Sequence, residues 1–536
     1  MAAADAHFDS TDNGYEIDAQ VASALGTVES LRVARFHDGY EAYSAGVEIG
    51  LVEQAFAERL TLRAFTSGYD KDLQSDARGL VPYGEVRYGE QLCGLLGTYQ
   101  QHWTERFSLQ AQAAYTYRSE AFEDLGSWVY DWSGAQVGSR GGVGLGGETG
   151  VGPIDRIVGG HRAFARLNLE FSPSRAHIFS LGVAPEYSDR EGENLLLERE
   201  QFDGLSARRR QLLVVSGLEY RARLWEVGAP EAVAADRGGW GYGVENALFV
   251  KHYATRVRAE VAGSTAAELV PETGTHFTFG FGDAVQVRLA EGWFAKASYE
   301  YATRIPDLDT MVGAYGDSLY VANLKLKPER SHSFNLGASG QLQDPLLGAL
   351  SMEVNGFVRE RLDVVQLLTS SVYVRPLNLG RTRTFGIEGN LVWTSAGRWL
   401  RLNGASRYQD QRSLSTEVGL EAIEGERVPR RPWFFASWGA DLELGRLLLN
   451  DGQRLCVFYQ GRYVHGYEVL PDVGPRGLGV PDQTLHSVGL TYGLQAALAG
   501  LHATVEVQNL NDAKVYDYGG LERPGRAFYA KLVGEL

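Results

Sequence analysis

The chain has 536 residues, of which 65 are glycine, 27 are tyrosine and 3 are methionine, and its formal net charge at pH 7 is -16. The abundance of glycine and tyrosine favours many strands and turns over a helical bundle. The negative charge argues against nucleic-acid binding, which needs clustered Lys and Arg. No apolar run reaches the length of about eighteen residues that a transmembrane helix requires, although a membrane-spanning β-barrel remains compatible with the sequence.

The N-terminal residues lack the features of a secretory signal. Met1–Ser10 contain no basic region followed by an apolar stretch. We therefore expect residues 1–27 to be a lead-in without a signal peptide or plug, and residues 28–536 to form one repetitive architecture. We also expect the chain to be incomplete, because the rest of the sequence resembles that of an exported protein.

The first half of the chain contains short segments that alternate between apolar and polar residues, as strands with two different faces do. In chain order they are Val47–Leu51, Leu60–Phe65, Val86–Tyr99, Phe107–Tyr117, Phe164–Phe171 and His177–Glu186. A Gly-rich excursion, Arg118–Gly160, is expected between the fourth and the fifth. The stretch from Trp225 to Thr275 is ambiguous. Because barrels of this kind have an even number of strands, we expect it to contain one more strand.

The second half repeats the pattern more clearly. The expected strands are Ala284–Tyr301, which holds two, His332–Gln341, Ser351–Glu360, Thr384–Trp393, Trp399–Tyr408, Trp433–Leu444, Leu455–Val464, Thr484–Gln495, His502–Asn509 and the terminal strand. Long connections are expected at Arg304–Pro328, from Glu360 to Arg381, at Gln409–Glu426 and at His465–Asp482. In the terminal strand, Phe528, Ala530, Leu532, Gly534 and Leu536 share one face.

Short and long connections alternate along the chain, which is typical of transmembrane barrels. We therefore predict an all-β fold, a transmembrane antiparallel β-barrel of about 22 strands with short periplasmic turns and long extracellular loops. Aromatic residues at the strand ends fit an interfacial girdle; they are Trp103, Trp293, Trp399, Trp433 and Tyr467.

The stretch from Tyr299 to Gly337 resembles the barrel of TonB-dependent outer-membrane receptors. Its Arg304-x-Pro306 turn precedes an external loop, and Leu326–Glu329 opens the descending strand. The Asn-Leu-x-Asp turn at Asn509–Asp512 and the Pro524–Arg526 lead into the last strand are also similar to that family. The resemblance is good from about Phe277 to the end. It implies a receptor in the outer membrane of a Gram-negative bacterium.

Two features depart from the family pattern. Family members usually end on an aromatic residue that the barrel-assembly machinery recognises, whereas this chain ends on Leu536. Family members also carry a plug domain and a TonB-binding box before the barrel, and here strand-like sequence begins within the first few dozen residues. We expect the plug and the signal peptide to be missing from the sequence or encoded separately, since a barrel of about 22 strands has a wide lumen.

The motifs that could carry other chemistry are weak. Gly142, Gly144 and Gly147 match G-x-G-x-x-G but lie in the Gly-rich loop, without the strand and helix that a phosphate site needs. The remaining candidates are a possible Ca²⁺ site at Asp70, Asp72 and Asp76, a possible acid/base pair of Asp307 and Asp309 near Glu300, the basic run Arg208–Arg210, and the isolated cysteines Cys93 and Cys456. Structural roles explain each of them better, so we predict no catalytic, metal or cofactor site and no enzyme.

The loop aromatics are the more plausible ligand-binding surface, because aromatic rings on Gly-rich loops can stack on a ligand. They are Trp128, Tyr130, Trp132, Tyr315 and Tyr320. Loop packing explains them equally well, and the substrate-binding residues stay unknown.

The resemblance implies active uptake of a large scarce nutrient, such as a siderophore, cobalamin or an oligosaccharide. The partners it implies are outer-membrane lipid, the barrel-assembly machinery, the ligand, and a plug with the TonB complex. The alternatives are a passive outer-membrane pore or scaffold and, less favoured, a soluble all-β enzyme acting on carbohydrate.

Overall fold

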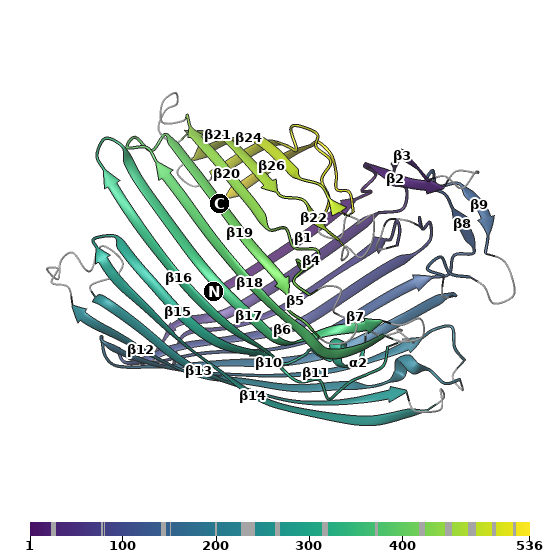
Figure 1. Cartoon of the computed structure of the whole chain (residues 1–536), viewed down its shortest axis with the longest axis horizontal. Helices are drawn as coiled ribbons and strands as arrows, with labels where there is room; N and C mark the ends of the chain where they lie inside the picture. Colours follow the sequence, from purple (N-terminus) through teal and green to yellow (C-terminus); the bar gives the residue numbers. More distant parts are fainter. Residues whose placement is uncertain are drawn as a thin grey trace.

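The structure is a computed structural model, and it describes residues 1–536 apart from 23–27, 77–78, 80, 141–145, 151, 199–200, 227–241, 263–267, 314–319, 370–373, 417–423, 445–452, 470–478, 496–499, 518–520 and 536. One antiparallel sheet of 20 strands forms the wall of a barrel. Its strands run obliquely side by side and curve round on themselves, as Figure 1 shows. The prediction of an all-β antiparallel barrel is confirmed, with twenty strands against the estimated 22.

The wall strands follow the order of the sequence. The first ten are β1 (Ala2–Thr11), β4 (Tyr40–Gln54), β5 (Ala57–Asp72), β6 (Arg87–Thr104), β7 (Phe107–Asp124), β10 (Ile154–Ser174), β11 (His177–Asn194), β12 (Arg209–Glu226), β13 (Tyr242–Ala262) and β14 (Leu269–Ala290). The other ten are β15 (Trp293–Arg304), β16 (Glu329–Asp344), β17 (Gly348–Thr369), β18 (Val374–Thr394), β19 (Leu400–Ser413), β20 (Phe434–Glu443), β21 (Gln453–Val464), β24 (Gln483–Gln495), β25 (Gly500–Gln508) and β26 (Ala527–Glu535). Registered antiparallel ladders link each strand to the next, from β1 with β4 to β25 with β26.

The remaining, shorter elements lie in the connections between the wall strands. They are the hairpins β2 (Glu16–Ala22) with β3 (Val28–Ala34), β8 (Trp128–Tyr130) with β9 (Gln136–Ser139), and β22 (Tyr467–Glu468) with β23 (Gly479–Val480), the 3-10 turn η1 (Gly204–Ser206) and the helix α2 (Leu308–Val312). In Figure 1 the hairpins β2–β3 and β8–β9 stand together at one end of the barrel. No helix in the described part of the chain is long and apolar enough to cross a membrane.

The two rims of the barrel differ. One rim, here called the turn rim, carries connections as short as residues 55–56, 105–106, 175–176 and 291–292. The opposite loop rim carries the long connections 12–39, 73–86, 125–153, 305–328, 414–433, 465–482 and 509–526. This division was predicted from the alternation of short and long connections.

Side chains of opposite character line the two faces of the wall. On β18, Phe385, Ile387 and Leu391 lie on the exposed outer face, and the ladder with β17 sets Phe385 opposite Val358. On the inner face, Glu388 is paired with Arg407 of β19 and accepts a hydrogen bond from the Asn355 amide of β17. Because side chains alternate along a strand, every wall strand presents one set to each environment.

Several boundaries differ from the prediction. The connection expected between Glu360 and Arg381 is mostly strand, because β17 and β18 continue to Thr369 and from Val374. A register shift next to Asp363, which has a φ of 55°, breaks the alternation on which the prediction depended. The Gly-rich excursion is shorter than expected, at residues 125–153, and the ambiguous stretch contains β13 and the start of β14. The expected lead-in 1–27 already contributes the wall strand β1.

Candidate functional site: the mouth of the barrel

The three carboxylates considered as an acid/base group serve separate structural roles. Asp307 accepts a hydrogen bond from the Thr310 backbone at 2.7 Å and caps α2. Asp309 lies 3.1 Å from Arg190, and Glu300 lies 3.2 Å from Lys251. The structure therefore does not bring these carboxylates together as a catalytic pair.

The other candidate motifs are also structural. Gly147 has a φ of 87° and a Cβ there would clash with the backbone of Gly152, so it is a turn residue; Gly142 and Gly144 lie outside the described residues. Asp76 accepts a hydrogen bond from the Val81 backbone at 3.0 Å, and Asp72 lies 3.5 Å from Arg87. Across the part of the chain that is described, no group of three or more His, Cys, Asp or Glu side chains is placed to hold a metal ion.

The basic run does not form a free cationic surface. Arg208 lies 2.6 Å and Arg210 3.3 Å from Asp189, and Arg209 donates to the carbonyl of Gly313 at 2.5 Å. Both cysteines are free thiols on wall strands. Cys93 is exposed on the outer face and opposite Tyr117, as expected for a lipid-facing residue.

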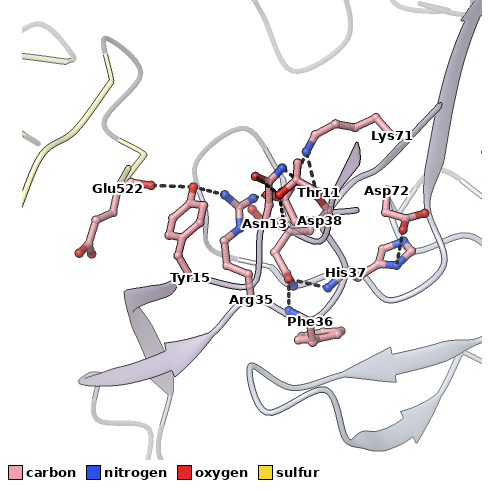
Figure 2. A network of polar contacts seen from close by, with 12 residues as sticks. Thr11, Asn13, Tyr15, Arg35, Phe36, His37, Asp38, Lys71, Asp72 and Glu522 are labelled. Carbon is pink, nitrogen blue, oxygen red and sulfur yellow. Dashed lines mark hydrogen bonds and ion pairs between the residues drawn. The ribbon is translucent and has the colours of Figure 1, made fainter. Parts of the chain in front are cut away.

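A polar network joins the first loop to the barrel wall at the loop rim (Figure 2). Asp38, of which 4% is exposed, lies 3.0 Å from Arg35 and 2.6 Å from Lys71 of β5. The Asn13 amide donates to the Asp38 carbonyl at 3.1 Å. A buried carboxylate needs such partners to offset its lost hydration, so the network fixes the start of β4 against the hairpin β2–β3.

The same network reaches the far end of the chain. Arg35 donates to the Tyr15 hydroxyl, and Tyr15 donates to the carbonyl of Glu522 at 3.2 Å. The Glu522 carboxylate accepts hydrogen bonds from Arg32 and from the backbone of Asp18, each at 2.7 Å. We call these five residues the rim clasp. It joins the loops that flank β1 and β26, the strands at which the registered ladders begin and end.

A second contact ties together loops 73–86 and 125–153. The Glu148 carboxylate, of which 2% is exposed, accepts hydrogen bonds from the backbones of Gly84 and Glu85, at 2.9 and 2.7 Å. Burial raises the pKa of Glu148, against the lowering effect of these hydrogen bonds, and the nearby Asp124 raises it further.

The loop aromatics have mixed roles. The Tyr130 hydroxyl donates to Glu85 at 2.7 Å, Trp132 is buried, and the Tyr320 hydroxyl donates to the Thr310 carbonyl at 2.6 Å. Trp128 stays exposed, and Tyr315 lies outside the described residues. Three of the five are therefore held in loop packing, which the sequence could not distinguish from ligand binding.

Loop 305–328 is folded inward against the wall. Leu308, Met311 and Val312 of α2 are buried with Leu324 and Leu326 against Val257 and Ala259, which lie on the inner face of β13. The loop thus brings a buried apolar cluster to the mouth. The family resemblance singled out Leu326 and Glu329. Leu326 packs in this cluster, and the Glu329 carboxylate accepts a hydrogen bond from Arg361 at 2.7 Å.

A chain of ion pairs crosses the inner wall to this loop. Arg118 of β7 lies 2.6 Å from Glu90 of β6 and 3.2 Å from Glu120. Arg190 of β11 lies 3.5 Å from Glu120 and 3.1 Å from Asp309 of α2. The mouth thus combines tied outer loops, an inward loop and a polar inner wall.

A family profile described as "TonB dependent receptor-like, beta-barrel" matches residues 250–510. Over these residues the chain belongs to the TonB-dependent receptor β-barrel family. The matched residues include α2 and its inward loop as well as β14 to β24. No curated protein matches the chain significantly.

Solved structures share the fold of this TonB-dependent receptor barrel. The siderophore receptor PiuA from Acinetobacter baumannii is 12% identical with a TM-score of 0.69, and the alignment covers 100% of this chain and 81% of PiuA. The copper transporter OprC is 13% identical with a TM-score of 0.68, covering 99% and 75%. The FrpB iron transporter from Neisseria meningitidis is 12% identical with a TM-score of 0.67, covering 99% and 77%. These similar proteins are a receptor and two transporters.

Proposed function

We propose that this chain forms the barrel of an outer-membrane receptor for active uptake of a large scarce nutrient, such as a siderophore, cobalamin or an oligosaccharide. The observation that carries the proposal is the construction of the mouth. Long loops are tied to one another at the rim, and one loop folds inward against the wall. A simple scaffold needs neither feature.

We further propose that a plug domain completes the barrel and couples it to the TonB complex. The proposal is supported by the family and by the inner wall, where the side chains of exposed ion pairs could bind a plug domain. Lys296 lies 3.4 Å from Glu353, with 44% and 48% of their side chains exposed. Exposed pairs of this kind contribute little to the stability of the barrel itself, so they are free to exchange partners.

The outer face supports a location in the outer membrane of a Gram-negative bacterium, in contact with lipid and inserted by the barrel-assembly machinery. On β14, Phe277, Phe279 and Phe281 follow one another on this face, each exposed. An exposed aromatic row is costly in water and favourable in a bilayer. Membrane fractionation tests this location directly.

A growth experiment separates a receptor from a passive pore even while the ligand is unidentified. The gene is deleted, and growth is measured with siderophore-bound iron, cobalamin or one of several oligosaccharides as the limiting nutrient. If the chain is a receptor, its deletion should impair growth on one of these nutrients. Deletion of TonB alone should cause the same growth defect, and deletion of both genes should cause no larger one. If deletion of the gene reduces growth by the same amount in a strain that already lacks TonB, the result contradicts active uptake and favours a pore.

A further inference from the structure

Three tyrosines form a row on the inner wall below the rim clasp. Tyr40 of β4, Tyr69 of β5 and Tyr88 of β6 have ring centroids 5.8 Å apart at each step, and all three rings are half-buried. Their strand positions alternate with those of the outer-face residues Ile49, Leu62 and Leu95, so the row faces the lumen. The rings are tilted to one another by 38° and 37°, so the row offers successive aromatic faces on which the rings of a ligand can stack.

A pocket of about 200 Å³ opens beside this row. The side chains that line it together with Tyr40 and Tyr69 are His7 and Asp9 of β1, Ser44 of β4, Ser67 of β5 and Glu90 of β6. Its volume is below that of ordinary small-molecule pockets, which begin at about 300 Å³, so it takes one ring of a larger ligand. The lining offers aromatic rings together with hydroxyl, imidazole and carboxylate groups.

The charges around the pocket disfavour an anionic ligand. Asp9 and Glu90 are two carboxylates against a single imidazole, that of His7, and the nearby cation Arg118 is already 2.6 Å from Glu90 and 3.2 Å from Glu120. A phosphate, carboxylate or anionic chelate therefore meets negative charge here. An uncharged ligand with many hydroxyl groups fits, because each carboxylate can accept several hydrogen bonds from hydroxyls.

We propose that this pocket binds a pyranose ring of a neutral oligosaccharide, with the ring stacked on Tyr69 and Tyr40 and its hydroxyls donating to Asp9 and Glu90. Tyr88 extends the surface toward a neighbouring sugar unit. The inference rests on the proposed uptake function and deepens it, since it selects one substrate class. The apolar face of a pyranose matches an aromatic ring, while its edge carries the donors that the carboxylates need.

The test uses the purified full-length chain in detergent micelles on an array of defined neutral oligosaccharides, with acidic oligosaccharides on the same array. Wild type is compared with the Tyr40→Ala/Tyr69→Ala double variant. Tyr115→Ala is the matched control, because Tyr115 is also a wall tyrosine but lies on the exposed outer face. Circular dichroism and heat-modifiable gel migration establish that each variant is folded.

The proposal predicts binding to at least one neutral oligosaccharide, weakened at least about tenfold in the double variant and unchanged in Tyr115→Ala; tenfold corresponds to about 1.4 kcal/mol. Absence of binding to every neutral oligosaccharide, equal binding by the folded double variant, or binding of acidic oligosaccharides alone overturns it. These outcomes leave the uptake proposal standing, since the TonB-dependent growth test does not depend on the substrate class.

Discussion

Arg32 and Glu522 are 490 positions apart in the chain, yet a guanidinium nitrogen of Arg32 lies 2.7 Å from a carboxylate oxygen of Glu522. Only 7% of the Glu522 side chain is exposed. The ion pair brings the loop after β1 against the loop before β26, so the first and last wall strands are held at the same place on the rim. It is the central contact of the rim clasp.

Replacing Glu522 by alanine is predicted to release the hairpin β2–β3. The change removes hydrogen bonds from Arg32 and from the Asp18 backbone. Hydrogen bonds to charged groups contribute about 1.5–3 kcal/mol, so docking of the hairpin should weaken by an amount of this order. Limited trypsin digestion measures the effect as faster cleavage after Arg32. Glu29→Ala, an exposed carboxylate on the same hairpin, is the control, and equal cleavage rates in the two variants contradict the prediction.

Replacing Met311 by alanine is predicted to detach the inward loop. Met311 is fully buried among Leu308, Leu326 and Val257, and a core Met→Ala change costs about 2–5 kcal/mol. Hydrogen exchange should show lost protection at the amides of Met311 and Gly313, which donate to the carbonyls of Asp307 and Asp309. Protection at the β17–β18 ladder should not change. Unchanged exchange at Gly313 would show that the loop is held by other contacts.

The contact between loops 73–86 and 125–153 is predicted to weaken as the pH rises. The pKa of Glu148 is raised in the folded loop, chiefly by burial, above its ordinary value of 4.5. A raised carboxyl pKa contributes stability that is fully present below the ordinary value and is lost as the pH rises through the folded value. Amide protection at Gly84 and Glu85, corrected for intrinsic exchange, should therefore fall above pH 4.5. In Glu148→Gln this dependence should vanish, and a wild type with constant protection refutes the assignment.

The fold was predictable to the extent that it depends on periodicity. The outer-face residues Phe385, Ile387 and Leu391, and the terminal row of Phe528, Ala530 and Leu532, follow a strict alternation that sequence alone reveals. The prediction failed where a bulge at Asp363 shifts that alternation. The estimate of about 22 strands also exceeded the 20 strands that the described residues contribute to the sheet.

The candidate site was less predictable, because it depends on which loops meet. Nothing in the sequence near Tyr15 or Arg32 points to Glu522, which comes close to them only through the arrangement of the whole sheet. Tyr40, Tyr69 and Tyr88 form a row only once the registers of β4, β5 and β6 are known. In contrast, the turn at Asn509 and Asp512 was recognisable, and both residues have the positive φ, 51° and 50°, that Asn and Asp tolerate.

A charge placed on either face of β14 tests most directly whether the outer face contacts lipid. Val285 faces outward five residues before β14 ends at Ala290 on the turn rim, and the adjacent Ala284 faces the lumen, close to Glu245 and Glu353. In lipid vesicles, Val285→Arg should lower the free energy of unfolding by about 2–4 kcal/mol, whereas Ala284→Arg should change it by less than about 1 kcal/mol. Equal effects of the two substitutions, or a loss confined to Ala284→Arg, would contradict the assignment of the two faces and with it a barrel that spans a membrane.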